Sequence, residues 1–203
     1  MSGTEHFDQA AAAWDLADRR VTLARDVVAA IAARVTLSKE QAALDFGCGT
    51  GLVTLALAPL VAAIAAADTS PGMLKTLAGK AAAAGIPLRI LALEPDGNGE
   101  LGGPYDLIVS SMTLHHVADV AALFRKFGQH LRPGGQVALA DLDEEDGSFH
   151  EAGVHIHHRG FSRRQIQTWL GDAGFQEVLL ETATVTRKEG KDYSVFLATA
   201  RKA

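Results

Sequence analysis

Short apolar runs alternate with segments of helical periodicity along almost the whole chain, and this alternation narrows the choice of fold more than any other feature. The runs predict strands at residues 42–46, 61–67, 88–93, 105–110 and 137–142, and then two closing strands near 175–184 and 193–199. Helical spacing predicts helices within 10–35, 52–60, 71–84, 120–131 and 163–173, the first of which should divide into two. Strands separated by helices form a mainly parallel α/β sheet, and ligands bind at its carboxyl edge.

Two of these helices carry recognisable start signals. Ser70 precedes Pro71, and a serine can cap free amides while the fixed φ of proline suits the first helical position. Ser162 with Gln165 has the spacing of a capping box. We therefore expect helices to begin directly after both serines.

Charge, hydropathy and cysteine content exclude several classes of function. The net charge is −5 and there is no long block of Lys or Arg, which argues against nucleic-acid binding. The N-terminus lacks a secretory signal pattern, and the most apolar stretch, 52–67, is too short to span a bilayer. The single cysteine, Cys48, cannot form an intramolecular disulfide. We expect a cytoplasmic protein without membrane or nucleic-acid partners.

A glycine-rich loop lies between the first predicted strand and the following helix. Asp45 is followed by Gly47, Gly49 and Gly51, and glycines let a ligand approach the backbone and the amide end of a helix. The spacing G-x-G-x-G differs from the G-x-G-x-x-G of dinucleotide-binding folds. An acid two residues before the first glycine would repel a pyrophosphate but could attract an ammonium group.

Two further acids follow neighbouring strands. Asp68 ends the second predicted strand, 21 positions after Gly47, where a carboxylate can accept hydrogen bonds from both hydroxyls of a ribose. Glu94 ends the third predicted strand. Together with the glycine loop, three carboxylates along one edge imply a cationic cofactor that contains ribose.

Five segments carry a resemblance to a known family: LDFGCGTG (44–51), AADTSPGML (66–74), ILALEP (90–95), YDLIVSSMTLHHVAD (105–119) and LRPGGQVALAD (131–141). In their order and content they resemble the class I S-adenosylmethionine (SAM)-dependent methyltransferases, closest to the small-molecule, ubiquinone-biosynthesis-like branch. The resemblance implies a Rossmann-like, doubly wound seven-stranded sheet of order 3-2-1-4-5-7-6, with strand 7 antiparallel and N-terminal cap helices. It also implies one methyltransferase domain over 1–203, with a helical cap (1–40), a cofactor-binding core (41–142) and a substrate side (143–203).

The resemblance also implies a binding role for residues at several strand ends. The methionine end of SAM would lie against Asp45 and the loop residues Gly47, Cys48, Gly49 and Gly51, the ribose against Asp68, the adenine against Thr69, Met73 and Glu94, and the sulfonium beside Ser110. Cys48 is expected to be a small packing residue within the loop rather than a nucleophile.

Two departures from the family pattern bear on these roles. Glu94-Pro95 stands where the family has Asp followed by a small residue, and the proline offers no backbone N–H, so adenine contacts could move to Asp96 or Gly97. Ser110-Ser111-Met112-Thr113 replaces the Asn/Asp-Pro-Pro-Tyr-type tetrad of the nucleic-acid branches. This replacement argues against methylation of a flipped base.

Six of the eight histidines lie at 115–116 and 150–158, inside or beside the predicted substrate side. We expect His115, His150 or His155 to accept a proton from the methyl acceptor, the last two near Asp143. Packing or helix capping by the 115–116 pair, and a solvated loop at 150–158, are the structural alternatives. Zn²⁺ or Fe²⁺ binding that includes His155 and His157 is a weaker alternative, and we assign no metal.

The function implied by the resemblance is in-line transfer of a methyl group from SAM to a small or medium-sized molecule. A non-catalytic SAM-binding regulatory module remains an alternative. A nicotinamide-dependent oxidoreductase is a further one, opposed by the loop spacing and Asp45. Phe7 and Trp14, on the leading helical segment, either cover the cofactor or pack in the core. The acceptor atom and the oligomeric state stay open.

Overall fold

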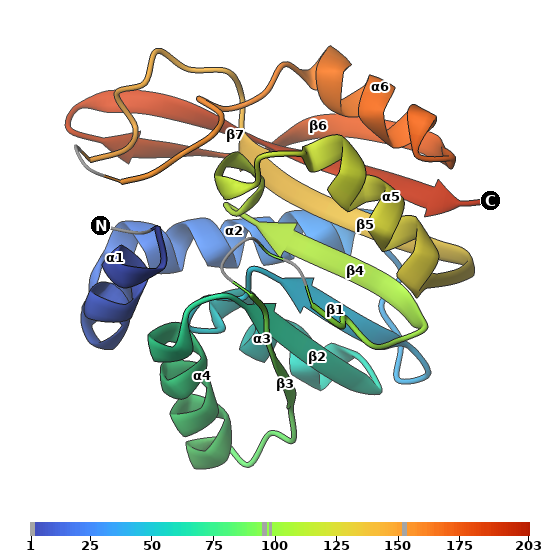
Figure 1. Ribbon diagram of the computed structural model, residues 1–203, viewed down its shortest axis with the longest axis horizontal. Coiled ribbons are helices and arrows are strands. Elements are labelled where there is room, and N and C mark those ends of the chain that lie inside the picture. The colour runs from blue at the N-terminus through green and yellow to red at the C-terminus, as the bar shows by residue number, and fades with distance from the viewer. Residues whose placement is uncertain (1–2, 95–96, 98, 152–153) are drawn as a thin grey trace.

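Seven strands form one sheet in a computed structural model that describes residues 3–94, 97, 99–151 and 154–203 (Figure 1). The strands are β1 (Ala42–Phe46), β2 (Ala63–Asp68), β3 (Arg89–Ala92), β4 (Tyr105–Ser111), β5 (Leu131–Leu142), β6 (Phe175–Lys188) and β7 (Lys191–Lys202). Their order is β3-β2-β1-β4-β5-β7-β6, with β7 antiparallel to both of its neighbours. The predicted topology is confirmed.

Helices cover both faces of this sheet. They are α1 (Gly3–Ala10), the 3₁₀ helix η1 (Ala11–Leu16), α2 (Asp18–Arg34), α3 (Leu52–Leu57), η2 (Ala58–Leu60), α4 (Pro71–Ala83), η3 (Leu114–His116), α5 (Val120–His130) and α6 (Arg163–Asp172). α5 and α6 pack on one face, through Phe124, Phe127 and Ile166. α2 and α3 pack on the other, through Val27 and Leu57. Because both faces are covered, the central strands are largely apolar on both sides rather than alternating, with polar residues such as Asp45 and Ser110 near their carboxyl ends.

Both predicted helix caps are present. The Ser70 hydroxyl accepts a hydrogen bond from the Met73 amide at 3.1 Å, and the Ser162 hydroxyl accepts one from the Gln165 amide at 3.2 Å. The leading helical segment is longer and more divided than predicted, since it begins at residue 3 and consists of α1, η1 and α2. The N-terminal pieces come to lie beside α4 rather than continuing α2.

β5 begins six residues earlier than its apolar run predicts, at Leu131 rather than 137. Tyr105 pairs with Leu131 and Leu107 pairs with Gln136, so the Pro133-Gly134-Gly135 segment bulges out between two paired stretches. The Pro-Gly-Gly segment therefore interrupts the strand, but the pairing with β4 continues on both sides of it. A turn signal in the sequence does not show whether pairing resumes in this way.

The parallel strands point their carboxyl ends toward the side of the molecule where α1 lies (Figure 1). The glycine loop after β1, the acid that ends β2, and η3 after β4 all begin at this edge. In the part of the chain that is described, no helix has the length and apolarity needed to cross a membrane.

Candidate active site

The glycine loop turns between β1 and α3 with three left-handed residues. Gly47, Gly49 and Gly51 have φ values of 72°, 52° and 83°. A Cβ at Gly47 would lie 2.2 Å from the Thr113 side chain, and one at Gly51 would lie 2.2 Å from Leu77, whereas one at Gly49 would meet no atom of the described residues within 4 Å. Protein packing therefore requires two of these glycines, and the third faces open space that a ligand can use.

Asp68, at the end of β2, holds the loop from the adjacent strand. One carboxylate oxygen, Oδ2, accepts a hydrogen bond from the Gly49 amide at 2.7 Å, and Oδ1 accepts one from the Ser70 amide at 2.9 Å. Burial raises the pKa of Asp68, although these backbone donors oppose the shift. A carboxylate offers about four lone pairs, so each oxygen can still accept a hydrogen bond from a hydroxyl.

Asp45 lies beneath the loop rather than on its rim. Its side chain is buried, and Oδ2 accepts a hydrogen bond from the Thr54 hydroxyl of α3 at 2.6 Å. Burial raises the pKa of Asp45 to about 7, with the Thr54 hydrogen bond opposing the shift and the nearby Asp68 adding to it. The carboxyl group can therefore change its charge near neutral pH.

The other residues expected to bind the cofactor lie along the same edge. Ser110 is buried and donates its hydroxyl to the Phe46 carbonyl at 2.8 Å, which joins β4 to β1. Met73 is buried in the first turn of α4, and Thr69 is half-buried beside Asp68. Glu94 is exposed after β3, and its carbonyl accepts a hydrogen bond from the Gly97 amide at 2.8 Å. Asp96 lies outside the described residues, and the contacts of all these residues with a cofactor stay predictions.

Cys48 is buried within the loop. Burial, reinforced by the negative charges of Asp45 and Asp68, raises the pKa of the Cys48 thiol well above its ordinary value. A thiol with a raised pKa is a weak nucleophile, which agrees with the packing role expected for it.

Two acids of the N-terminal helices bind the glycine loop and α4. Asp15 accepts hydrogen bonds from the Thr50 hydroxyl at 2.6 Å and from the Lys80 ammonium at 2.5 Å. Asp8 accepts hydrogen bonds from the Ser70 hydroxyl at 2.6 Å and the Gly72 amide at 2.8 Å. We name these two sets of contacts the N-terminal latch. The latch could not be predicted from the sequence, because no local pattern distinguishes Asp8 or Asp15 from a solvent-exposed acid.

The aromatic residues of the same segment reach the histidines. The Phe7 ring lies 5.6 Å from the Trp14 ring and 5.1 Å from the His116 ring, measured between centroids, in edge-to-face contact. The latch thus brings Phe7 from α1 to the residues that follow β4. Phe7 and Trp14 are half-buried, and whether they cover a cofactor stays a prediction.

His115 is the buried member of the histidine group. Its Nδ1 lies 2.7 Å from Asp141 Oδ1, and its backbone amide donates to Asp141 Oδ2 at 3.3 Å. Burial alone would raise the pKa of Asp141, but attraction and hydrogen bonds from His115, together with the Leu142 amide, hold that pKa below its ordinary value. Since an ionised carboxylate only accepts, Nδ1 carries the proton and the Nε2 of a neutral imidazole is left as an acceptor.

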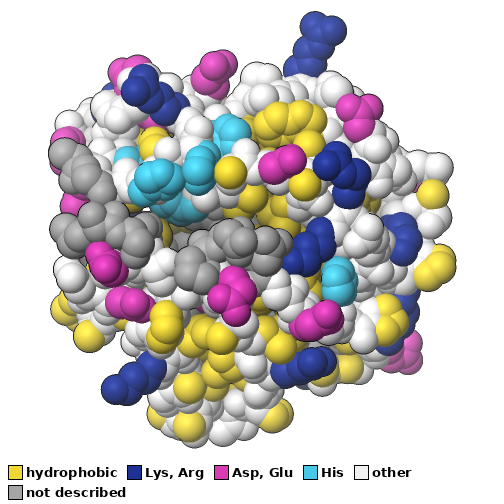
Figure 2. All heavy atoms as spheres, viewed as in Figure 1, with side chains coloured by type: hydrophobic (Ala, Val, Ile, Leu, Met, Phe, Trp, Pro, Cys, Tyr) yellow, Lys and Arg dark blue, Asp and Glu magenta, His cyan; other side chains and the backbone are white. Residues whose placement is uncertain are grey.

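Two further imidazoles pack against His115. Ring centroids lie 4.2 Å apart for His115 and His116 and 4.6 Å apart for His115 and His150. Burial and the neighbouring His115 lower the pKa of His116 to about 3 and that of His150 to about 4, so both rings are neutral at pH 7. The Nε2 atom of His150 is buried without a hydrogen-bond partner. We name His115, His116 and His150 the histidine cluster, and Figure 2 shows histidine side chains gathered on one face of the molecule.

The acid bonded to the cluster is Asp141, through His115, whereas Asp143, which was expected near His150 or His155, is paired with an arginine. Asp143 forms a two-pronged ion pair with Arg163, at 2.8 and 2.7 Å. Asp141 lies at the carboxyl end of β5, just as Asp45 and Asp68 lie at the carboxyl ends of β1 and β2. A search of the sequence for acids at strand ends would therefore also have found Asp141. His155 is exposed, and it contributes only its backbone carbonyl, which accepts a hydrogen bond from His116 Nδ1 at 2.9 Å.

The histidines following the cluster do not form a recognisable metal site. The rings of His155 and His157 lie 4.7 Å apart, as expected for side chains that share one side. Among the described residues, no group of three or more His, Cys, Asp or Glu side chains could hold a metal ion. The 115–116 pair does not cap α5 either, since Asp119 accepts the hydrogen bond from the Ala122 amide at 2.8 Å.

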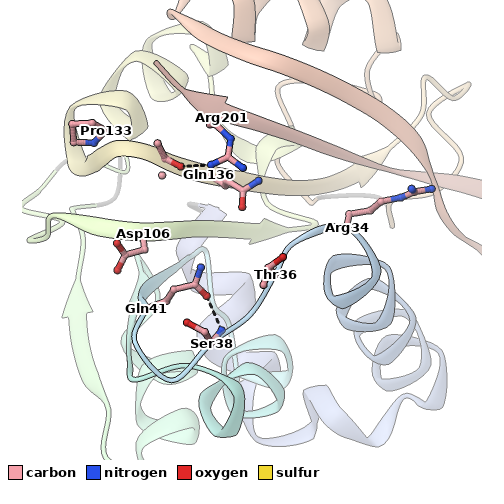
Figure 3. A pocket seen from close by; sticks show the side chains of 10 residues that line it. Arg34, Thr36, Ser38, Gln41, Asp106, Pro133, Gln136 and Arg201 are labelled. Carbon is pink, nitrogen blue, oxygen red and sulfur yellow. Dashed lines mark hydrogen bonds between the residues drawn. The ribbon is translucent and has the colours of Figure 1, made fainter.

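A cleft of about 360 Å³ lies at the opposite, amino edge of the sheet (Figure 3). Its lining includes Gln41 before β1, Asp106 in β4 and Arg201 in β7. Arg201 donates to the Gly134 carbonyl at 2.8 Å and pairs with Glu177, so its charge is already engaged. This cleft is separate from the glycine loop and the histidine cluster.

Comparison with known proteins identifies the family. A model described as a methyltransferase domain matches residues 16–180, and the chain belongs to the class I SAM-dependent methyltransferases. The chain is 33% identical over 140 residues to an uncharacterized methyltransferase of Schizosaccharomyces pombe, covering 61% of this chain and 49% of that protein. It is 30% identical over 149 residues to the ubiquinone biosynthesis O-methyltransferase of Xanthomonas axonopodis pv. citri, covering 66% of this chain and 62% of that one.

The fold agrees with this family. The magnesium protoporphyrin IX methyltransferase of Synechocystis PCC 6803, solved with bound SAM, superposes with a TM-score of 0.66 at 20% identity, covering 93% of this chain and 82% of that one. The matches to the two curated relatives above span 49% and 62% of their lengths.

The residues at the carboxyl edge fit SAM as the cofactor. Gly49 leaves open space where a side chain would otherwise stand, and Asp68 keeps unused lone pairs on both oxygens beside it. Asp45 can supply negative charge near the methionine ammonium, because its pKa of about 7 allows it to ionise when a cation binds. The ribose and the methionine end would thus meet Asp68 and Asp45, and these contacts stay predictions.

Proposed function

We propose that this protein transfers the methyl group of SAM to a proton-bearing atom, such as a hydroxyl oxygen, of a small or medium-sized molecule. His115 accepts the proton in this proposal. The observation that carries the proposal is the buried hydrogen bond between His115 and Asp141, at the carboxyl ends of β4 and β5. Thr113, two residues before His115, donates its hydroxyl to the Gly47 carbonyl at 3.2 Å, so the imidazole is tied to the loop that holds the cofactor.

When bound, SAM supplies an electrophilic methyl carbon on a sulfonium, and S-adenosylhomocysteine (SAH) is left after the transfer. The acceptor oxygen forms the new bond to carbon, and its proton moves to Nε2 of His115. Asp141 holds Nδ1–H and so presents Nε2 as the acceptor, and its negative charge stabilises the imidazolium that forms. Asp141 is therefore a positioning residue.

Alignment supplies most of the rate in such a displacement, up to ~7–11 kcal/mol of the barrier in favourable cases. The glycine loop and the N-terminal latch provide this alignment by fixing one reactant on a rigid strand end. General base catalysis adds about 10²–10⁴-fold. An acceptor that ionises easily would depend less on His115 than an alcohol would.

Turnover of labelled SAM with a panel of phenols, alcohols and thiols tests the proposal. We expect His115→Gln to lower turnover by about 100-fold or more with the best acceptor while SAH affinity stays within about twofold of wild type. The matched control is His130→Asn, at the far end of α5, where the ring binds the Gly102 carbonyl. Unchanged turnover in His115→Gln would exclude this residue as the base.

A further inference from the structure

Two arginines in the first turn of α2 lie close to the histidine cluster and lack carboxylate partners. The guanidinium carbon of Arg19 lies 5.1 Å from the centroid of the Phe149 ring, and that of Arg20 lies 3.6 Å from the Trp14 ring. Within the described part of the chain, neither arginine forms an ion pair, although Arg20 donates a hydrogen bond to the Trp14 carbonyl at 3.3 Å. Both are half-buried, and this burial lowers the pKa of each guanidinium despite the attraction of Glu151.

A half-buried guanidinium without an anion is unusual, because the loss of hydration is only partly offset by an aromatic ring. Other arginines of this chain do pair. Arg163 binds Asp143, Arg132 binds Asp106, and Arg34 binds Glu181. Among the described residues, Arg89, Arg125, Arg159 and Arg164 also form no ion pair, but these four are exposed, so Arg19 and Arg20 differ from them in being half-buried.

Arg19 is connected to the proposed base through a short series of ring contacts. The Phe149 ring lies 5.0 Å from the His150 ring, which lies 4.6 Å from the His115 ring. His150 contributes the buried Nε2 atom that has no partner. Two unsatisfied polar groups, a guanidinium and an imidazole nitrogen, thus flank Phe149 beside the proposed base.

Cations and carboxylates both lie around Phe149. Lys188 donates to the Phe149 carbonyl at 2.7 Å, and its ammonium lies 5.9 Å from the ring centroid. Glu145 Oε2 accepts hydrogen bonds from the Gly147 and Phe149 amides at 2.8 and 3.1 Å, and among the described residues the other oxygen, Oε1, is buried without a partner. Glu151 is exposed and attracts both arginines without contacting them. An anionic ligand would meet several cations here.

We infer that the methyl acceptor carries an acidic group, a carboxylate or a phosphate, which binds Arg19 next to Phe149 while the atom to be methylated faces His115. This inference rests on the proposed function and adds the substrate class to it. Arg20 lies one residue further along the same turn and reinforces the positive charge.

Equilibrium binding to SAH-saturated protein tests the inference without requiring turnover. The probes share one scaffold: 4-hydroxybenzoate, 4-hydroxyphenyl phosphate and the neutral 4-hydroxybenzamide. We expect at least one acidic probe to bind about tenfold or more tightly than the amide by calorimetry. The better of the two acidic probes then distinguishes a carboxylate from a phosphate.

Three variants test whether Arg19 is the source of the preference for acidic probes. Arg19→Met should bring the acidic probes to within about twofold of the amide, and Arg19→Lys should keep part of the difference. Arg25→Met is the matched control, since Arg25 lies on the same helix with its side chain 72% exposed. SAH affinity, measured first for each variant, confirms that the fold and cofactor site are intact.

Equal binding of all three probes to wild type, or a preference that survives in Arg19→Met, would overturn the inference. A failure of the proposed function would be seen separately. It would appear as absent SAH binding, or as unchanged turnover in His115→Gln, and neither readout depends on the acidic probes.

Discussion

Nδ1 of His115 lies 2.7 Å from Oδ1 of Asp141, and both side chains are almost completely buried where β4 and β5 end. The two residues are 26 positions apart in the chain and meet because β4 and β5 are parallel neighbours. An aligned, desolvated pair of this kind holds one tautomer of the imidazole. The same geometry makes the pair important for stability.

Replacing the acid should destabilise the fold. In Asp141→Ala, His115 Nδ1–H and the Leu142 amide lose their acceptor, and each buried donor left unpaired costs about 1–3 kcal/mol. The folded-state pKa of Asp141 is lowered, so its contribution is complete above the unfolded value of about 4 and is lost only as the pH falls further. Urea denaturation near neutral pH measures the difference, with exposed Asp172→Ala as the control. A variant as stable as wild type would contradict this view of the pair.

The neutral histidines should make stability depend on pH. The pKa values of His116 and His150 are about 3 and about 4 in the folded state, below the unfolded value of about 6.5. The unfolded chain therefore takes up protons first, and stability is lost as the pH falls from about 6.5 toward those folded values.

His150→Gln should reduce the loss of stability between pH 7 and pH 5 by roughly 1–2 kcal/mol, measured by urea denaturation at both pH values. The raised pKa of Asp45 has the opposite effect, because it favours the folded state as the pH falls. This effect is present in both the wild type and the variant, so it cancels in the comparison. An identical pH dependence in the variant would show that His150 is not held neutral by the fold.

Two glycine substitutions should separate packing from ligand binding. Gly47→Ala places a Cβ 2.2 Å from Thr113 and should lower the free energy of unfolding strongly. Gly49→Ala meets no protein atom within 4 Å, so its cost should be only the strain of a left-handed alanine, about 1–2 kcal/mol. It should nevertheless weaken SAH binding by about tenfold or more, because its methyl group occupies the open space. Calorimetry checks this, and full affinity in Gly49→Ala would place the cofactor elsewhere.

The N-terminal latch should control the residence time of the cofactor. Asp8→Asn with Asp15→Asn removes the charge from both acids and weakens their bonds to Ser70 and Lys80. We expect faster SAH dissociation in stopped-flow experiments and faster hydrogen exchange in residues 3–16. Asp18→Asn, an exposed acid at the start of α2, serves as the control. If the double variant released SAH at the wild-type rate, the latch would be structural only.

Much of this architecture follows from patterns in the sequence. Apolar runs separated by helical periods predict the five parallel strands, and Asp45, the glycines and Asp68 predict the cofactor edge. The partner of His115 is harder to predict, because it depends on the turn after β4. There Met112 adopts a left-handed conformation, with φ of 55°, and directs the chain so that η3 lies over the end of β5. A left-handed methionine has no sequence signature, since its conformation is imposed by the surrounding structure.

The contacts of the N-terminal latch are a second part of the site that the sequence could not predict. Asp8 and Ser70 are 62 residues apart, and Asp15 and Thr50 are 35 apart. Periodicity and capping patterns report neighbours within a helix or strand, and such pairs depend on where a separate helix docks. The sequence could suggest an aromatic cover from Phe7 and Trp14, but it could not show which polar contacts fasten that cover.

A crystal structure of the protein with SAH bound would decide whether the carboxyl edge of the sheet is the cofactor site. We predict ribose hydroxyls within hydrogen-bond distance of the Asp68 carboxylate, the amino-acid end against the 47–51 loop, and the sulfur facing His115. SAH bound away from Asp68 and Gly49, or with its sulfur directed away from the histidine cluster, would show that this assignment is wrong.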